Sequence, residues 1–170
     1  MKQFISIVFF LIVSVQLTAQ VDVNELYNKA IALKKERKCA EAIPLLLKVT
    51  ELKPTQPKVF TDLGWCYNET KQFDQAITSL QKAVLADSSD ATAHGEIGYS
   101  YYSIQQYTVA IGHLNISNRL KPKTETTIYY LGLCFVKLNG KADAVKKYNE
   151  LSLMNSSYAG KLLEEIKNMK

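Results

Sequence analysis

The sequence predicts an all-α protein, an α-solenoid of four antiparallel helix pairs with a C-terminal capping helix. The first observation is a column of glycines that recur with a constant period of 34, each directly after a branched aliphatic residue: Gly64, Gly98 and Gly132. The same step joins two further columns, Ala76, Ala110 and Ala144 in one and Leu80, Leu114 and Tyr148 in the other. One constant period in several columns indicates that a single structural unit has been duplicated and stacked.

Each unit is expected to be a helical hairpin. Two antiparallel helices approach closely only where one of them presents no side chain, so the glycines fit as contact points on the first helices. The reciprocal small positions on the second helices are Ala42, Ala76, Ala110 and Ala144. Larger apolar residues recur around them at helical spacing and fill the space between the helices. Prolines at 54, 57 and 122 start or stop helices, because proline lacks an amide hydrogen.

The period divides the chain into repeats at residues 23–56, 57–90, 91–124 and 125–158. The first repeat is degenerate, with Ala30 in place of the glycine, and the fourth has Ser156 where a proline is expected. Residues 159–170 place Leu162 and Ile166 on one face and charged residues around the other. Since the end of a stack needs a lid with a polar outer side, we expect this segment to be a capping helix.

The segment 1–19 is expected to be a secretory signal peptide. Lys2 precedes an apolar run at positions 4–17, and Ala19 offers a small residue for cleavage. This run is shorter than the roughly 20 residues that a membrane-spanning helix needs. We therefore expect residues 20–170 to be exported, to the periplasm or outside the cell, with no stable membrane span after cleavage.

The local pattern of the repeats resembles a known family. Residues 60–67 read Phe-x2-Leu-Gly-x2-Tyr and residues 94–101 read His-x2-Ile-Gly-x2-Tyr, and both are followed by the alanine and leucine columns. This pattern and its period resemble the tetratricopeptide repeat. The resemblance covers all four repeats and implies a right-handed superhelix. It also implies a non-catalytic protein-protein interaction scaffold whose first helices line a concave groove.

In the family, positions 2, 5, 9 and 12 of each repeat commonly face that groove. Carried over by register, they place large aromatic and aliphatic side chains on one helical stripe. The predicted partner-binding residues, including one neighbour at position 6, are Tyr27, Ile31, Trp65, Tyr99, Tyr102, Tyr129, Tyr130 and Leu133. Large aromatics offer apolar contact area and a polar tip, which is typical of interaction sites. Packing against the next repeat is the alternative role for the same side chains.

The expected partner is another protein or a peptide. One family function, capture of a chaperone's C-terminal carboxylate, needs lysine, asparagine and arginine at five register positions. Starting from the first repeat, those positions hold Tyr27, Ile31, Asp62, Thr92 and Glu96, so this clamp is not expected. The alternative function is a structural subunit of an envelope or secreted complex that associates through its end faces, with itself or with other chains.

The formal net charge of +5 is spread along the chain, and acids interrupt any basic stripe, so no nucleic-acid partner is expected. One basic cluster, Lys34, Lys35, Arg37 and Lys38, leaves an anionic surface or an acidic partner open. His94 and His113 have no metal-like or nucleophile-like sequence context. The sequence therefore predicts no enzyme, no cofactor and no metal site.

The chain has three cysteines. Cys66 and Cys134 occupy the same column two repeats apart, so we expect them to be buried and beyond disulfide reach of each other. Cys39 is expected to lie in a turn and to be the more exposed thiol.

Overall fold

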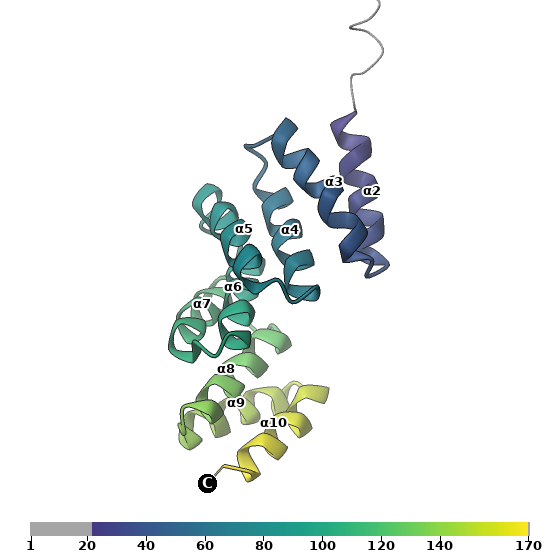
Figure 1. Cartoon of the computed structure of the whole chain (residues 1–170). Helices are drawn as coiled ribbons and strands as arrows, with labels where there is room; N and C mark the ends of the chain where they lie inside the picture. The colour runs from purple at the N-terminus through teal and green to yellow at the C-terminus, as the bar shows by residue number, and fades with distance from the viewer. Residues whose placement is uncertain (1–21, 170) are drawn as a thin grey trace, which may run out of the picture.

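The computed structural model describes residues 22–169, which form nine α-helices and no strand (Figure 1). The helices are α2 (Val23–Lys35), α3 (Cys39–Leu52), α4 (Pro57–Glu69), α5 (Phe73–Ala86), α6 (Ala91–Ser103), α7 (Tyr107–Leu120), α8 (Glu125–Lys137), α9 (Lys141–Leu153) and α10 (Ser157–Lys167). The predicted all-α solenoid is confirmed. The predicted signal peptide, residues 1–19, lies outside the described residues.

The helices pair in sequence order as hairpins. The first helices of the four pairs are α2, α4, α6 and α8, and the second helices are α3, α5, α7 and α9. Each first helix also packs against the first helix of the next pair, whereas no two of the described second helices approach each other closely. A stack that is tighter along one side must curve toward that side, so the first helices form the inner face of the arc seen in Figure 1.

Every first helix ends in the same left-handed turn. The residue after the C-cap has a positive φ at four positions that share one repeat column, Arg37 (60°), Lys71 (60°), Gln105 (63°) and Asn139 (57°). The next amide then donates to a carbonyl five residues back, as Lys38 N–H does to the Leu33 oxygen over 2.9 Å. This Schellman arrangement satisfies the last carbonyls of the helix and reverses the chain into the second helix.

Two of the three column glycines lie inside their own hairpins, as predicted. A Cβ atom on Gly64 would be 2.7 Å from Leu80 Cδ2, and one on Gly98 would be 2.7 Å from Leu114 Cδ2. The third differs, because a Cβ atom on Gly132 would meet Leu162 of α10 and would be 2.9 Å from its Cδ1 atom. The four alanines on the second helices have no exposed surface, which confirms their place at the contacts.

The hydrophobic core is divided along the stack rather than gathered at one centre. One cluster of buried residues joins the first and second repeats, another the second and third, and another the third and fourth. A last cluster joins the fourth repeat to α10. Each repeat is therefore stabilised by its immediate neighbours, as in other repeat proteins.

The cap begins at Ser157, two residues before the predicted start at 159. Ser156, which stands where the repeat pattern expects proline, is the N-cap: its hydroxyl oxygen accepts the Tyr158 N–H over 3.2 Å. The same hydroxyl donates to Glu125 over 2.6 Å and so fixes α10 to α8. Leu162 and Ile166 are buried against the fourth repeat, as a cap requires.

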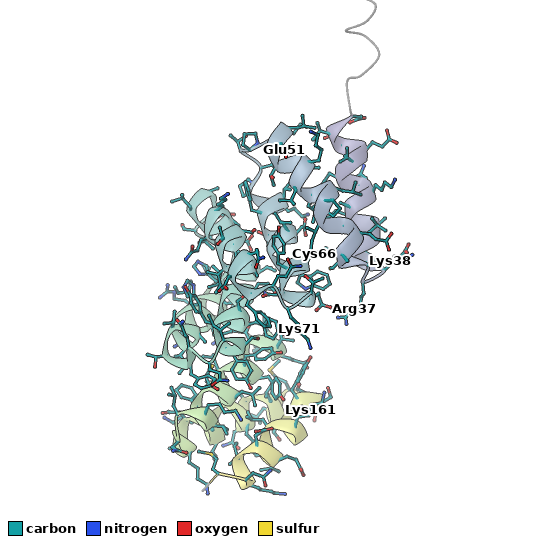
Figure 2. The ribbon with its side chains drawn as sticks, in the orientation of Figure 1. Arg37, Lys38, Glu51, Cys66, Lys71 and Lys161 are labelled. Carbon is teal, nitrogen blue, oxygen red and sulfur yellow. The ribbon has the colours of Figure 1, made fainter. Side chains whose placement is uncertain are left out.

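Side chains cover both the inner and outer faces of the stack (Figure 2). Within residues 22–169, no helix has both the length and the hydrophobicity that crossing a membrane requires.

Candidate functional site

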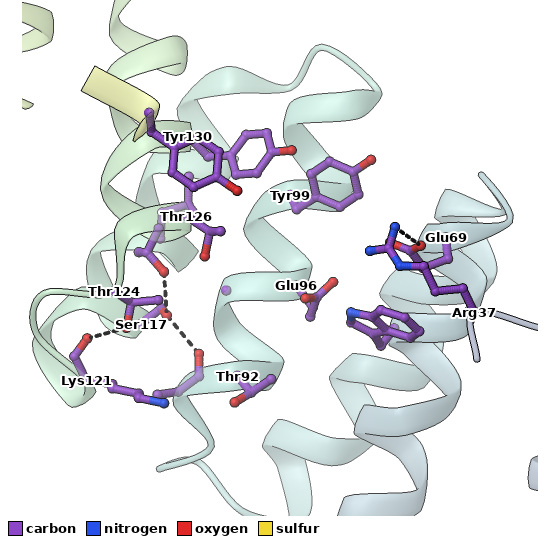
Figure 3. A pocket seen from close by; sticks show the side chains of 16 residues that line it. Arg37, Glu69, Thr92, Glu96, Tyr99, Ser117, Lys121, Thr124, Thr126 and Tyr130 are labelled. Atoms are coloured by element: carbon purple, nitrogen blue, oxygen red, sulfur yellow. Dashed lines mark hydrogen bonds and ion pairs between the residues drawn. The ribbon is translucent and has the colours of Figure 1, made fainter. Parts of the chain in front are cut away.

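The inner face carries two adjoining hollows between the first helices. The N-terminal hollow has a volume of about 590 Å³ and is lined by residues of α2 and α4. The central hollow has a volume of about 340 Å³ and is lined mainly by residues of α4, α6 and α8 (Figure 3). Arg37 and Trp65 line both hollows. We call the two hollows together the inner groove.

Five of the eight predicted partner-binding residues line the inner groove. They are Tyr27, Ile31, Trp65, Tyr99 and Tyr130. All five are partly buried, so each packs on the protein with one side and leaves the other open. Tyr102 and Tyr129 do not line the hollows and pack instead among neighbouring rings.

Leu133 is buried, with 5% of its surface exposed, and belongs to the core cluster that joins the fourth repeat to α10. Leu133 shares its repeat position with Tyr99, but its shorter side chain packs into this core instead of lining the hollows. We therefore leave Leu133 out of the proposed contact surface.

Trp65 occupies the junction of the two hollows. Its ring packs against the core of the first two repeats, and Lys34 Nζ lies 4.9 Å from the ring centroid. A lysine at this distance is attracted by the face of the indole. The ring is thus held in one orientation, which lowers the entropy cost of using it in binding.

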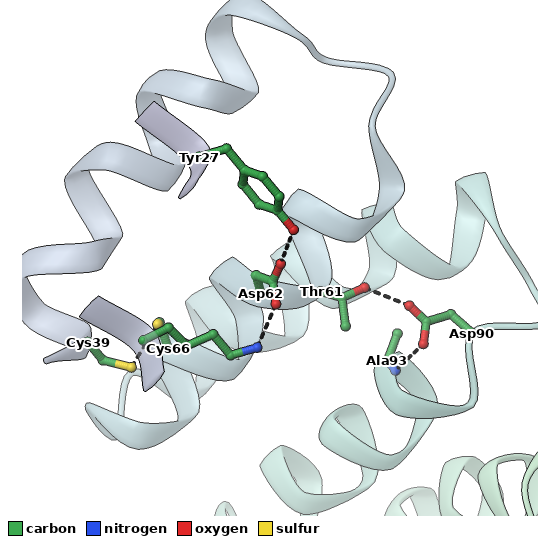
Figure 4. Close-up of polar contacts among 8 residues, drawn as sticks. Tyr27, Cys39, Thr61, Asp62, Cys66, Asp90 and Ala93 are labelled. Atoms are coloured by element: carbon green, nitrogen blue, oxygen red, sulfur yellow. Dashed lines mark hydrogen bonds and ion pairs between the residues drawn. The ribbon is translucent and has the colours of Figure 1, made fainter. Parts of the chain in front are cut away.

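The N-terminal hollow has a buried carboxylate at its wall. The Tyr27 hydroxyl donates to Asp62 over 2.6 Å, and Lys34 Nζ donates to the other Asp62 oxygen over 2.5 Å (Figure 4). Burial, together with the Asp62 hydrogen bond, raises the pKa of Tyr27. Tyr27 therefore remains a protonated donor to Asp62, and its ring rather than its hydroxyl is free for contact.

The C-terminal wall of the inner groove is formed by the rings of Tyr99, Tyr130 and Tyr158, and the rings of Tyr102 and Tyr129 pack behind them. The Tyr130 ring centroid lies 5.0 Å from that of Tyr99 and 5.3 Å from that of Tyr102. Tyr129 lies 5.6 Å from Tyr130 and 4.8 Å from Tyr158 of the cap. Burial raises the pKa of Tyr130 and that of Tyr102, the latter to about 12. Tilted rings at these distances support one another and present a rigid aromatic surface.

Sequence reasoning missed the polar residues of the groove. Glu96 lines the central hollow and accepts a hydrogen bond from Asn68 Nδ2 over 2.9 Å. Burial raises the pKa of the Glu96 carboxyl, and the Asn68 hydrogen bond opposes that rise. Asp62, Glu96 and Tyr130 share one repeat column, so the register that identified Tyr130 also pointed to both acids.

The basic cluster is partly paired. Lys34 binds Asp62, Lys38 Nζ lies 2.7 Å from Glu36, and Arg37 lies 3.6 Å from Glu69. The Arg37 and Glu69 side chains stand at the edge of the central hollow in Figure 3. Lys35 and Lys58 also line the N-terminal hollow, where Asp62 is the single acid among the described lining residues. This end of the inner groove is therefore positively charged.

The expected exposure of Cys39 is wrong. Cys39 is the first residue of α3 rather than a turn residue, and 2% of its surface is exposed. Its thiol lies against that of Cys66, which is fully buried like Cys134. Across residues 22–169, no group of three or more His, Cys, Asp and Glu side chains is arranged to hold a metal ion.

The comparisons with known proteins agree with this architecture. Residues 33–95 match the family model described as tetratricopeptide repeat. No curated protein matches the chain significantly by sequence.

Several solved structures share the fold. The chain is 23% identical to a MamA RS-1 ArsTM double mutant, over 81% of this chain and 77% of that one, with a TM-score of 0.75. It is 22% identical to MamA 41-end from Desulfovibrio magneticus RS-1, over 89% and 79%, with a TM-score of 0.68. It is 21% identical to the first TPR of Spaghetti (RPAP3) bound to HSP90 peptide SRMEEVD, over 71% and 96%, with a TM-score of 0.67. These likenesses show that the chain has a tetratricopeptide-repeat solenoid fold.

Proposed function

We propose that the chain is a non-catalytic interaction scaffold whose inner groove binds an extended or helical segment of another protein. The observation that carries the proposal is the groove itself, in which two hollows meet at Trp65 and are walled by Tyr27, Tyr99 and Tyr130. Partly exposed aromatic rings in a concave site are the residues that contribute most to binding in protein interfaces.

The peptide-bound RPAP3 domain supports the proposal, since a protein of this fold holds the HSP90 peptide SRMEEVD in its solved structure. The charge distribution of the inner groove also favours a particular distribution of residues in the bound segment. Lys35, Arg37 and Lys58 surround the N-terminal hollow, whose acid Asp62 already accepts bonds from Tyr27 and Lys34. We expect a bound segment to place acidic residues at this end and apolar or aromatic residues against the tyrosine wall at the other.

A peptide-display library selected on the purified chain tests the proposal. Selected peptides are synthesised with a fluorophore, and their affinities are measured by fluorescence anisotropy. We expect Trp65→Ala to weaken binding about 30-fold, equivalent to about 2 kcal/mol, because it removes the ring shared by both hollows. Tyr99→Ala should weaken it as well.

Leu85→Ala is the matched control, because Leu85 is 88% exposed near the end of α5, a second helix away from the groove. It should leave the affinity unchanged. Binding that survives both groove variants would overturn the proposal, and a lowered melting temperature of the Trp65 variant without weaker binding would assign that ring to the core.

We further propose that the chain is exported after removal of residues 1–19. Mass spectrometry of the N-terminal peptide of the protein isolated from its source should find the shortened chain, and a chain that keeps Lys2 would contradict export by this route.

Association through the end faces is the alternative function. A stable oligomer in light scattering that survives Trp65→Ala would favour it.

A further inference from the structure

Two cysteines from different repeats meet at the junction of the first and second hairpins. Cys39 begins α3 and Cys66 lies in α4. The Cys39 thiol donates to the Cys66 sulfur over an Sγ–Sγ distance of 2.7 Å (Figure 4). The two sulfurs are closer than the roughly 3.5–4.0 Å at which unbonded carbon atoms pack best.

The repeat register shows that this meeting is particular to one junction. The position of Cys39 holds Phe73 in the second repeat and Tyr107 in the third, whereas the position of Cys66 holds Ser100 and Cys134 in the following repeats. At the later junctions an aromatic ring therefore takes the place of the first thiol. Tyr107 packs against the cluster that contains Cys134, which explains why the third cysteine meets a ring instead of a thiol.

We propose that Cys39 and Cys66 form an intramolecular disulfide that ties the first repeat to the second. The oxidant is a small or protein disulfide, such as oxidised glutathione or a dithiol oxidoreductase. A covalent bond of about 2.05 Å requires the two sulfurs to approach by less than about 1 Å. The proposal is independent of what the inner groove binds.

The reaction proceeds by two exchange steps. The Cys39 thiolate attacks the oxidant disulfide, forming a mixed disulfide and expelling one thiolate of the oxidant. The Cys66 thiolate then attacks the Cys39 sulfur, and the second thiolate of the oxidant leaves. The two cysteines lose two protons and two electrons, and the oxidant disulfide is reduced to two thiols.

The position of Cys39 at a helix N-terminus indicates that it is the first cysteine to react. Cys39 stands at the N-terminus of α3, where the helix dipole favours a thiolate. Burial raises the pKa of both thiols. At Cys39 this rise is opposed by the Cys66 thiol, which can donate to the Cys39 thiolate once it forms, and by the charges of Lys34 and Arg37, whereas the charge of Glu69 adds to it. Because both sulfurs are buried, attack requires the first turn of α3 to open.

The bond would also fix one wall of the inner groove. Arg37 lies two residues before Cys39 and Trp65 lies next to Cys66, and these two residues line both hollows. A disulfide between Cys39 and Cys66 would therefore hold Arg37 and Trp65 in place relative to each other where the two hollows meet.

The experiment equilibrates the purified chain with oxidised and reduced glutathione, blocks free thiols with an alkylating agent and maps the peptides by mass spectrometry. We expect a linked pair of peptides containing Cys39 and Cys66, two hydrogen atoms lighter than their sum, with Cys134 alkylated. The melting temperature of the oxidised chain should exceed that of the reduced chain by about 5–10 °C, because the bond restricts the unfolded chain.

Cys134→Ala is the matched control and should keep both the linked peptides and the redox-dependent shift of the melting temperature. Cys39→Ser should lose both. Peptide mapping of the wild-type chain needs no variant to fold, so it decides the matter even if a cysteine variant is unstable. Alkylation of all three cysteines under oxidising conditions, a glutathione adduct that persists on Cys39, or links to Cys134 would overturn the proposal.

Discussion

At the scale of single residues, the absence of a side chain determines how closely the hairpins close. Leu114, 1% exposed, places its branched end where a Cβ atom on Gly98 would stand. Gly112 is also helical but lies on the exposed side of α7, and beyond the adjoining backbone of its own helix no described atom lies within 4 Å of the position that a Cβ would take. Glycine is thus required for close packing at position 98, whereas at position 112 it only lowers the stability of the helix.

We expect Gly98→Ala to lower the free energy of unfolding by about 2 kcal/mol, since the added methyl group overpacks a buried contact. Gly112→Ala should raise it by about 0.5–1 kcal/mol, because alanine favours the helix and meets no neighbour. Urea unfolding monitored by circular dichroism measures both. The double variant Gly98→Ala/Leu114→Ala should lose less than the sum of the single losses, and strict additivity would contradict the contact.

The register predicted two of the three glycine contacts and most of the aromatic groove residues, because a period states which positions share a helix face. It could not predict that Leu162 rather than Tyr148 fills the space over Gly132, since that depends on how α10 docks. The burial of Cys39 could have been predicted from the repeat register, because this residue shares a column with the aromatic residues that begin α5 and α7. The Asp62 and Glu96 hydrogen bonds required side-chain positions, which no period supplies.

At the scale of one element, the left-handed turns that end the first helices are built without glycine. Non-glycine residues are strained in this conformation by a steric conflict between Cβ and the following carbonyl. Asn139 tolerates it better than Arg37 or Lys71, because asparagine commonly adopts this region. The turns persist because the Schellman hydrogen bonds and the packed hairpins hold the backbone on both sides.

Lys71→Gly should therefore raise the free energy of unfolding by about 0.5–1 kcal/mol, after the greater freedom of glycine in the unfolded chain is subtracted. Lys71 is exposed, and its φ of 60° is one that glycine adopts without strain. The matched control is Gln81→Gly in the exposed interior of α5, which should lower the same quantity by about 1 kcal/mol. A loss at both positions would mean that the turn does not strain Lys71.

At the scale of the whole molecule, each repeat is stabilised by contacts with its immediate neighbours in the stack. The described helices pack only against the next helix and the one after it, so no contact among them joins the first repeat to the cap. The core clusters follow the same order along the stack. In such a linear array, damage at one end should stay near that end.

Leu162→Ala tests this property. Leu162 is fully buried and covers Gly132, so truncation should cost about 2–5 kcal/mol where α10 meets α8. We expect amide hydrogen exchange to accelerate in α8, α9 and α10, while amides of α2 to α5 keep most of their protection. Leu153→Ala, at a residue 86% exposed near the end of α9, should leave exchange unchanged throughout. Equal acceleration from α2 to α10 would show that the solenoid unfolds as one unit, and the inner groove would then depend on the cap as much as on its own repeats.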